Sequence, residues 1–381
     1  MEQLRRRFEE GAIVAGTLSG TSADGIDVVL TRMRSRSGTL ADLEQLSFSV
    51  EPFPESLRGR VRAALDGEPV LLRESALLSR DLGRAFGRAA RDAATRAGVA
   101  LDLVASHGQT VWHHDGEEAT GPATLQLGDG DFAAEEAGCA VASDFRQRDV
   151  AAGGEGAPIS ALADDWIFRA APRPCAILNL GGMANLTILG EREGDLAAFD
   201  TGPAGSLLDG LARRLHGEAF DAGGARALGG RADEILVAGM LDHPFFARTP
   251  PKSTGRDTFG QRWVGEFAAR AAHLPSQDCL ASAVELVAAS VALALDRFVP
   301  AKPDGLLVCG GGVLNRALLQ AIGRRIELPV RSTAELGVDP KAREALVFAV
   351  LGARCALAIP STHPGATGAR AGRVLGKLSH R

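Results

Sequence analysis

Two segments of the chain, residues 12–30 and 176–189, share one plan. Each is a run of strand-forming residues, a tip rich in Gly and small polar residues, and a second such run: AIVAGTLSGTSADGIDVVL in the first segment and AILNLGGMANLTIL in the second. Apolar runs joined by such tips predict β-hairpins. Because each hairpin opens one half of the chain, the repetition predicts a duplicated fold with a cleft between its halves, on pattern alone.

Strand-like and helix-like segments alternate along the rest of the chain, which favours an α/β fold. The length of 381 residues exceeds one ordinary core and suggests two domains. A Pro-bearing break at residues 171–174 precedes a new strand. We therefore expect an N-terminal domain over residues 1–172 and a C-terminal domain over residues 173–381.

The composition argues against several functional classes. The net charge of −5 provides no basic surface of the kind that binds nucleic acid. Charged residues interrupt the apolar stretches well short of the ~20 residues that a membrane span needs, and the first residues lack the pattern of a signal peptide. The five cysteines are scattered without a CxxC pair, as is typical of reduced thiols. These features predict a cytoplasmic protein.

The tips of the two hairpins have the composition of a phosphate cradle. Backbone N–H groups of Gly, Ser and Thr can converge on a phosphate because no side chain blocks its approach. The carboxylates of Asp24 and Asp27 would repel a phosphate unless Mg²⁺ lies between them, bound directly or through its waters. The alternative is that Asp24-Gly25 is only a turn dipeptide. The second, matching hairpin favours the cradle.

A third glycine turn, CGGGVLN at residues 309–315, follows an apolar run and opens a helix. This arrangement suits the adenosine or phosphate end of a nucleotide, although many such turns use Gly only for close packing. The segment AFDTGPAGSLLD predicts Asp200 at the end of a short strand, ahead of a Gly-Pro turn that opens a helix. A carboxylate there could act as a base; the alternative is that Asp200 or Thr201 caps the turn or the helix.

Three polar segments could recognise a polar substrate. Two of them, SHGQTVWHHDG and SDFRQRDVAAGGEGAP, offer side chains for hydroxyls and carboxylates: His107, Gln109, Thr110, Asp144, Arg146 and Asp149. The third, TPPKSTGRDTFG, holds Lys252, one of only four lysines, which could bind an anionic group or could lie on a solvated loop. The pair His113-His114 has no third ligand at a convincing spacing, which argues against a metal site built on histidine.

Taken together, the motifs resemble those of the anhydro-N-acetylmuramic acid kinase family. They occur in order from about Ile13 to Gly376: LSGTSADGID, SHGQTVWH, SDFRQRDVAAGGEGAP, LNLGGMANLT, FDTGP, PPKSTGRDTF, CGGGVLN and a final TGA. The resemblance implies a sugar kinase/Hsp70/actin (ribonuclease H-like) fold, with two related α/β domains around an ATP cleft. It also implies a homodimer, with ATP and Mg²⁺ as cofactors and an anhydro amino sugar as the small-molecule partner.

The resemblance further implies an activity and a set of site residues. The enzyme would use ATP and water to convert 1,6-anhydro-N-acetylmuramic acid into N-acetylmuramic acid 6-phosphate and ADP, with Asp200 as catalytic base and Asp27 and Asp24 near Mg²⁺. ATP would be bound by Gly20, Thr21, Ser22, Ala23, Asp24, Gly25, Ile26, Asp27, Gly181, Gly182, Asn185, Gly310, Gly311, Gly312 and Asn315. Substrate would be bound by His107, Gln109, Thr110, Asp144, Arg146 and Lys252.

One departure from the family pattern stands beside the predicted base. Where the family usually reads DTGPGN, this chain reads Asp-Thr-Gly-Pro-Ala-Gly-Ser over residues 200–206. The amide after the turn is missing, and Ser206 is a candidate to replace its contact. Two alternatives therefore stay open: a kinase of the same fold that acts on a free hydroxyl of another amino sugar, and a non-catalytic ATP-binding regulator.

Overall fold

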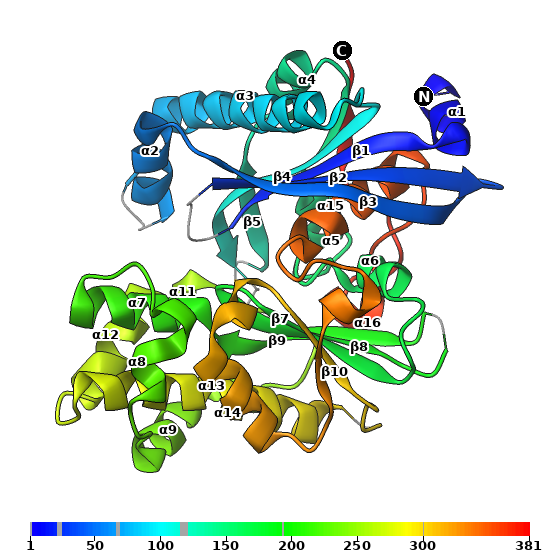
Figure 1. The fold of residues 1–381 in the computed structure, drawn as a ribbon. Coiled ribbons are helices and arrows are strands. Elements are labelled where there is room, and N and C mark those ends of the chain that lie inside the picture. Colours follow the sequence, from blue (N-terminus) through cyan, green and yellow to red (C-terminus); the bar gives the residue numbers. More distant parts are fainter. Residues whose placement is uncertain (1, 21–24, 66–68, 115–120, 193, 300) are drawn as a thin grey trace. The chain divides into compact units, whose positions relative to one another are not determined.

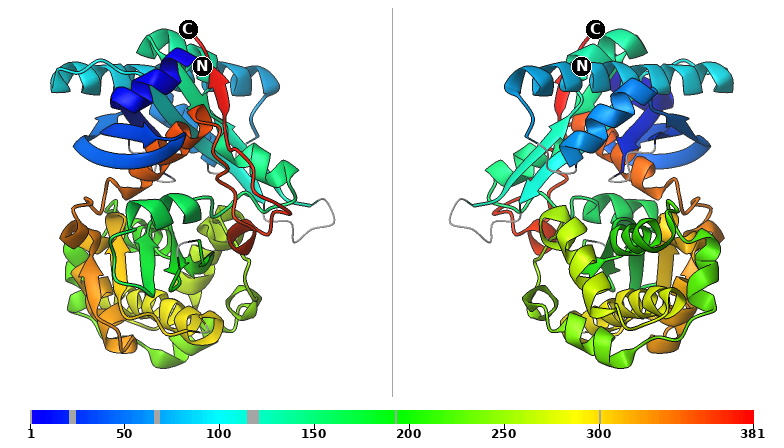
Figure 2. Two further views of the ribbon diagram at one scale, coloured as in Figure 1. Left: turned by 90° about the vertical axis from the view of Figure 1, so that its right-hand side faces the viewer. Right: turned by 90° about the vertical axis from the view of Figure 1, so that its left-hand side faces the viewer.

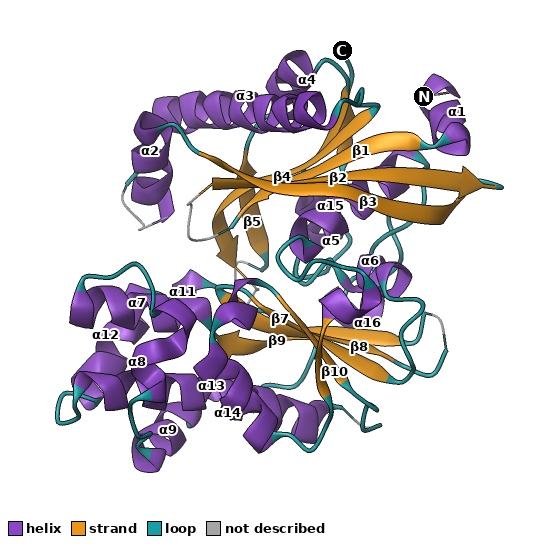
Figure 3. Ribbon diagram, in the orientation of Figure 1, coloured by secondary structure: helices purple, strands orange, loops and turns teal. Residues whose placement is uncertain are grey.

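The computed structural model describes the chain except for residues 1, 21–24, 66–68, 115–120, 193 and 300. It divides into two compact units, one of residues 1–167 with 342–381 and one of residues 168–341. The second unit thus begins five residues before the expected boundary at 172/173. The last 40 residues, which the sequence placed in the C-terminal domain, belong to the first unit. Figure 3 shows helices and strands in both units, as an α/β fold requires.

The first unit is built on a seven-stranded mixed sheet. Strand β1 (Ala12–Ser19) pairs antiparallel with β2 (Gly25–Arg36), and β2 with β3 (Thr39–Pro52). On its other side β1 runs parallel to β4 (Leu103–His114), and β4 to β6 (Ala140–Ser143). Strand β12 (Lys377–Ser379) extends the edge beside β6, which gives the strand order β12-β6-β4-β1-β2-β3. Strand β5 (Ala123–Leu127) lies outside this order and pairs antiparallel with β4.

Helices cover both faces of this sheet (Figures 1 and 2). Helices α3 (Leu72–Ala97) and α4 (Gly130–Ala137) pack on one face, and α15 (Arg343–Ala356) packs on the other. Small residues bring α15 close: a Cβ added at Gly16 would lie 2.0 Å from the Ala345 carbonyl oxygen. The unit also contains α1 (Glu2–Glu10), α2 (Glu55–Leu65), α5 (Phe145–Ala151), α6 (Ala161–Ile167) and α16 (Pro364–Thr367).

The second unit repeats the strand plan of the first. Strand β7 (Cys175–Leu180) pairs antiparallel with β8 (Met183–Leu189), and β8 with β9 (Leu196–Pro203). On its other side β7 runs parallel to β10 (Leu306–Cys309), and β10 to β11 (Val330–Ser332). The order β9-β8-β7-β10-β11 therefore has three antiparallel strands and then two parallel ones, and β3-β2-β1-β4-β6 of the first unit has the same arrangement. The predicted duplication is therefore confirmed in the topology.

The helices of the second unit enclose its apolar core against the sheet. Helix α13 (Ser276–Phe298) is long and apolar enough to cross a membrane, but 78% of its most apolar stretch is buried, as in a core helix. The other helices are α7 (Gly205–His216), α8 (Ala225–Leu228), α9 (Glu234–Leu241), α10 (Pro244–Ala247), α11 (Arg256–Phe259), α12 (Gln261–Arg270), α14 (Arg316–Arg325) and the 3-10 turns η1 (Ala222–Gly224), η2 (Gly311–Leu314) and η3 (Thr333–Leu336).

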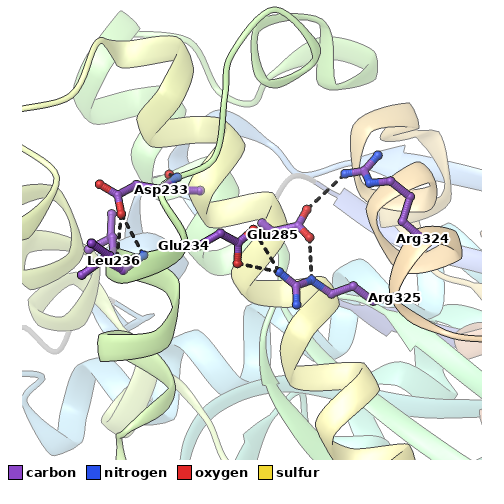
Figure 4. A network of polar contacts seen from close by, with 8 residues as sticks. Asp233, Glu234, Leu236, Glu285, Arg324 and Arg325 are labelled. Carbon is purple, nitrogen blue, oxygen red and sulfur yellow. Dashed lines mark hydrogen bonds and ion pairs between the residues drawn. The ribbon is translucent and has the colours of Figure 1, made fainter.

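An ion-pair network joins three of these helices (Figure 4). Glu285 on α13, whose side chain is 10% exposed, accepts hydrogen bonds from Arg324 and Arg325 on α14, and Arg325 also reaches Glu234 at the start of α9. Asp233 caps α9 by accepting from the Ile235 and Leu236 N–H groups. A carboxylate this buried is tolerated because two guanidinium groups satisfy it.

Candidate functional site

A row of polar residues crosses the sheet of the second unit. Strand register places Cys309 beside Asn179, Asn179 beside Asn185, and Asn185 beside Asp200. Paired residues of neighbouring strands point to the same face. The next residues along these strands belong to the apolar core: Leu178, Leu180, Ala184, Leu186, Phe199 and Val308. The row therefore lies on the sheet face opposite to that core, and it gathers two of the three asparagines of the chain.

Asp200 is held by the backbone of one neighbouring segment. Its N–H donates to the Lys252 carbonyl oxygen (3.0 Å), and its Oδ2 accepts from the Thr254 N–H (2.8 Å). The residue is 6% exposed. It lies within β9 rather than at its end, because the strand continues to Pro203. A carboxylate fixed from two sides in this way has a defined orientation, which a general base needs.

The capping alternative for Asp200 and Thr201 is wrong. The N-cap of α7 is Ala204, and it makes no side-chain capping bond. The N–H groups of Ala204, Gly205 and Ser206 donate instead to the Gly181 and Gly182 carbonyl oxygens, at 2.9–3.0 Å. Thr201 Oγ1 donates to the Ala184 carbonyl oxygen. The glycine turn of the second hairpin thus fastens the start of α7, which satisfies the orphan N–H groups of that helix.

This fastening also bears on the missing family asparagine. A Cβ at Gly205 would lie 3.0 Å from the Gly181 carbonyl oxygen, so a side chain there would crowd the turn. Among the described residues, Ser206 Oγ is buried and has no hydrogen-bond partner. A buried hydroxyl without a partner is costly unless something else binds it. Ser206 Oγ therefore retains hydrogen-bonding capacity at the start of α7.

In the turn at residues 310–312, two glycines are needed for close packing and one leaves its backbone open to a ligand. Gly310 has a φ of +85°, and a Cβ there would lie 2.7 Å from Asn179 Oδ1; at Gly312 a Cβ would lie 2.6 Å from Leu180 Cβ. These two glycines are required for packing. A Cβ at Gly311 would meet nothing within 4 Å. Only Gly311 therefore presents open backbone to an approaching ligand.

Asn315 has a structural task in the same segment. Its side chain is the N-cap of α14 and accepts from the Leu318 N–H at 3.0 Å. A Cβ at Gly224 would lie 2.2 Å from its Oδ1, so the two residues are in close contact. This explains why an amide stands after the turn, and the predicted role of Asn315 near adenosine stays a prediction.

Lys252 is buried rather than solvated. The residue is 1% exposed, its Nζ donates to the Phe245 carbonyl oxygen (3.2 Å), and the ammonium lies 4.6 Å from the Phe245 ring centroid and 4.5 Å from that of Phe298. Burial lowers the pKa of Lys252 to about 8, with Arg248 adding to the shift and Asp200 opposing it. The surface-loop alternative is therefore wrong, and the predicted binding of an anionic substrate group by Lys252 stays a prediction.

In the first unit, His107 and Arg146 form a buried pair. Arg146 Nε donates to His107 Nε2 (2.9 Å) and Arg146 Nη1 to the Gly156 carbonyl oxygen (2.7 Å). Since Nε2 accepts, the proton lies on Nδ1, which faces the Gly108 carbonyl oxygen at 3.2 Å. Burial, and then the charge of Arg146, lower the pKa of His107 well below 6.5. The imidazole is neutral at pH 7.

Gln109 and Thr110 lie next along β4. The Gln109 amide Nε2 donates to the Gly20 and Thr110 carbonyl oxygens, at 3.4 and 3.2 Å. Its Oε1 is buried and has no hydrogen-bond partner among the described residues. Thr110 Oγ1 accepts from Gln126. Gln109 thus reaches the first glycine tip with an acceptor still to be satisfied.

Asp149 has a role that the sequence did not predict. The residue is fully buried, and its carboxylate accepts from Thr367 Oγ1 (2.8 Å) and from the Gly156 N–H (2.9 Å). Burial raises its pKa, and these hydrogen bonds oppose that shift. Asp149 therefore joins the glycine-rich loop that holds Arg146 to the final TGA motif. Asp144 is placed differently: it forms an ion pair with Lys377 of β12.

The first glycine tip falls largely outside the described residues, including Thr21, Ser22, Ala23 and Asp24. Of its neighbours, Gly20 is exposed with open space at its Cβ position, whereas a Cβ at Gly25 would lie 2.7 Å from the Glu51 carbonyl oxygen. Ile26 and Val28 point into the core, so Asp27 points to the opposite face of β2. Within the described part of the chain, no group of three or more His, Cys, Asp or Glu could hold a metal ion.

Comparison with known proteins identifies relatives along nearly the whole chain. The family model for anhydro-N-acetylmuramic acid kinase matches residues 12–381. An anhydro-N-acetylmuramic acid kinase of Gloeobacter violaceus is 39% identical over 373 residues, covering 96% of this chain and 98% of the relative. One from Xanthomonas oryzae is 40% identical over 374 residues, covering 97% of each.

Solved structures resemble the chain more distantly. The activator of 2-hydroxyisocaproyl-CoA dehydratase from Clostridium difficile, with bound ADPNP, matches at a TM-score of 0.41 and 14% identity, covering 89% of this chain and 94% of that one. A ROK family glucokinase from Streptomyces griseus, in complex with glucose and AMPPNP, matches at 0.37 and 13%, covering 89% and 98%.

Proposed function

Because the chain belongs to the anhydro-N-acetylmuramic acid kinase family, a family of sugar kinases, we propose that it acts on 1,6-anhydro-N-acetylmuramic acid in cell-wall recycling. The proposed products are N-acetylmuramic acid 6-phosphate and ADP. The observation that carries the proposal is Asp200, which the 252–254 backbone holds opposite Asn185 on the strand that follows the Gly181-Gly182 turn. Cytoplasmic location and assembly as a homodimer stay predictions.

The proposed reaction couples ring opening to phosphoryl transfer. Asp200 accepts a proton from water as the water oxygen forms a bond to C1. The C1–O6 bond breaks, and O6 forms a bond to the γ-phosphorus of ATP while the bond from that phosphorus to the β-phosphate oxygen breaks. An inverting glycosidase needs a second carboxylic acid to protonate its leaving oxygen. Here the phosphoryl group takes that place, so a single carboxylate suffices.

The glycine turns supply the proposed ATP contacts. The carbonyl oxygens of Gly181 and Gly182 face the start of α7, which leaves the N–H groups of this turn as the donors for phosphate. Gly311 offers open backbone. Mg²⁺ in kinases is commonly bound by one or two carboxylates, water and substrate phosphates, and it neutralises phosphate charge. Asp27, with Asp24, fits that donor set.

Residues of the first unit supply the proposed sugar contacts. The guanidinium of Arg146 has a fixed direction, because it donates hydrogen bonds to His107 and to the Gly156 carbonyl oxygen. Gln109 Oε1 is buried and has no hydrogen-bond partner among the residues that the structure describes, so it can accept a hydrogen bond from a hydroxyl or an amide. Thr110 and Asp144 complete the proposed set.

The test is an ADP-release assay with 1,6-anhydro-N-acetylmuramic acid in ¹⁸O-labelled water. We expect ADP release to require the sugar, and the label to appear at C1 of the product when the sample is quenched and analysed at once, before anomeric exchange. Label in inorganic phosphate instead would mean ATP hydrolysis and would refute the proposal. Turnover of unbridged amino sugars without the anhydro sugar would favour the ordinary kinase. Nucleotide binding without turnover on any sugar would favour the regulator.

A substitution tests the assignment of the base. Asp200→Asn should lower kcat by roughly 10²-fold or more, the range for loss of a general base. Asp242→Asn, at the exposed end of α9, is the matched control and should leave kcat unchanged. Near-normal turnover by Asp200→Asn would remove Asp200 from the mechanism.

A further inference from the structure

Lys252 occupies an enclosure that is unusual for a lysine. Two aromatic rings, Phe245 at the start of α10 and Phe298 at the end of α13, lie within 4.6 Å of its ammonium. The Phe245 carbonyl oxygen accepts one of its hydrogen bonds. Cation–π contacts strengthen when the cation is removed from water. These contacts fix the ammonium in place, so they also fix the chain segment that carries it.

That segment is the one that holds Asp200. The Lys252 carbonyl oxygen accepts from the Asp200 N–H, and the Thr254 N–H donates to Asp200 Oδ2. One residue thus contacts Asp200 through its backbone and anchors itself through its side chain. If the side chain of Lys252 loses its anchor, the 252–254 segment can shift, and the direction of the Asp200 carboxylate shifts with it.

The charges around Lys252 give its ammonium a second effect. Arg248 and Arg297 are the cations near it, and Asp200 is the carboxylate that stabilises its charged form. The attraction is mutual, so the ammonium stabilises the ionised form of Asp200. With a pKa of about 8, Lys252 is mostly protonated at pH 7 and loses its charge under mildly alkaline conditions.

From this geometry we propose that Lys252 is a positioning residue for Asp200. Its caged ammonium anchors the backbone segment that binds and orients the Asp200 carboxylate. This role rests on the proposed function of Asp200 as base. It differs from direct binding of an anionic substrate group, because the ammonium faces the two rings and the Phe245 carbonyl oxygen.

The kinetic test compares pH profiles of kcat for Lys252→Met, Lys252→Arg and the wild type. Methionine keeps the length and removes the charge, and we expect kcat at pH 7 to fall at least tenfold, KM to change less than threefold, and the acid limb to move to higher pH. Loss of the Lys252 proton should lower wild-type kcat above about pH 8. Lys252→Arg should restore the acid limb and abolish that expected decline. Lys302→Met, at an exposed lysine, is the control.

Two outcomes would overturn the proposal. A rise in KM for the sugar with kcat and the pH profile unchanged would assign Lys252 to substrate binding. Superimposable profiles for Lys252→Met and the wild type would remove it from the site altogether.

A second measurement does not depend on turnover. In a double-mutant cycle of Lys252→Met and Asp200→Asn, we expect the shifts in urea midpoint to be non-additive, because the Lys252 side chain anchors the backbone segment that binds the Asp200 carboxylate. Additive shifts would refute the coupling. If the wild type shows no sugar-dependent turnover, the proposed function fails while this cycle still decides whether Lys252 and Asp200 interact.

Discussion

Replacing Lys252 by methionine should change how the stability of the second unit depends on pH. Burial lowers the pKa of Lys252 from 10.5 to about 8 in the folded protein. Each pKa unit corresponds to about 1.4 kcal/mol, so the shift represents about 3 kcal/mol of folding free energy. Methionine has no proton to lose, and its variant therefore lacks this pH dependence.

The sign follows from proton counting. Between pH 8 and 10.5 the unfolded chain keeps the Lys252 proton while the folded protein has released it, so the free energy of unfolding rises with pH. Below pH 8 both states are protonated, and the folded protein bears the full cost of the buried charge. The wild type should therefore gain about 2–3 kcal/mol relative to Lys252→Met between pH 7 and pH 10.

The assay is urea denaturation followed by fluorescence. Of the three tryptophans, Trp112 and Trp166 are replaced by phenylalanine in every protein compared, so that the fluorescence reports on Trp263 in the core of the second unit. Lys302→Met is the control, since an exposed lysine should show no such gain. A difference between wild type and Lys252→Met that stays constant within about 0.5 kcal/mol from pH 7 to 10 would refute the buried ammonium, because the expected gain is several times larger.

Three further outcomes are expected. Gly312→Ala should lower the free energy of unfolding by about 1–3 kcal/mol, because its Cβ would overlap Leu180. Gly311→Ala should leave the urea midpoint unchanged and raise the KM for ATP. If the two variants had equal effects on the urea midpoint and on the KM for ATP, the assignment of Gly311 would be contradicted. Arg343→Met should cost about 3–5 kcal/mol in urea denaturation, because it leaves Asp164 buried without its guanidinium partner, and a stable variant would show that the pair contributes little. Wild type should lose stability relative to His107→Gln as the pH falls below 6.5, because His107 takes up a proton in the unfolded chain and stays neutral in the folded protein. Parallel plots of unfolding free energy against pH for the two proteins, from pH 7 to 5, would contradict this.

Much of the fold could be predicted because it depends on local patterns. Apolar runs with Gly-rich tips predicted both hairpins, and the alternation of strand-like and helix-like segments predicted the α/β class. The long strand β3 is hard to predict from the sequence because it lies at the edge of its sheet, where half-exposed and polar residues replace the apolar alternation of a strand. Short elements such as β6 and α5 are hard to predict because they are too brief to show a period.

The sequence by itself determined the two-fold plan, the glycine turns, the family and the candidate base Asp200. Only the tertiary structure decided which side chains surround them. The sequence left open whether Lys252 binds an anionic group or lies on a solvated loop, whereas the structure shows that Phe245 and Phe298 enclose it. Asp149 lies 218 residues from Thr367, which it binds, and residues 342–381 return to the first unit. Burial and charge pairing depend on residues distant in the chain, and no local pattern encodes those partners.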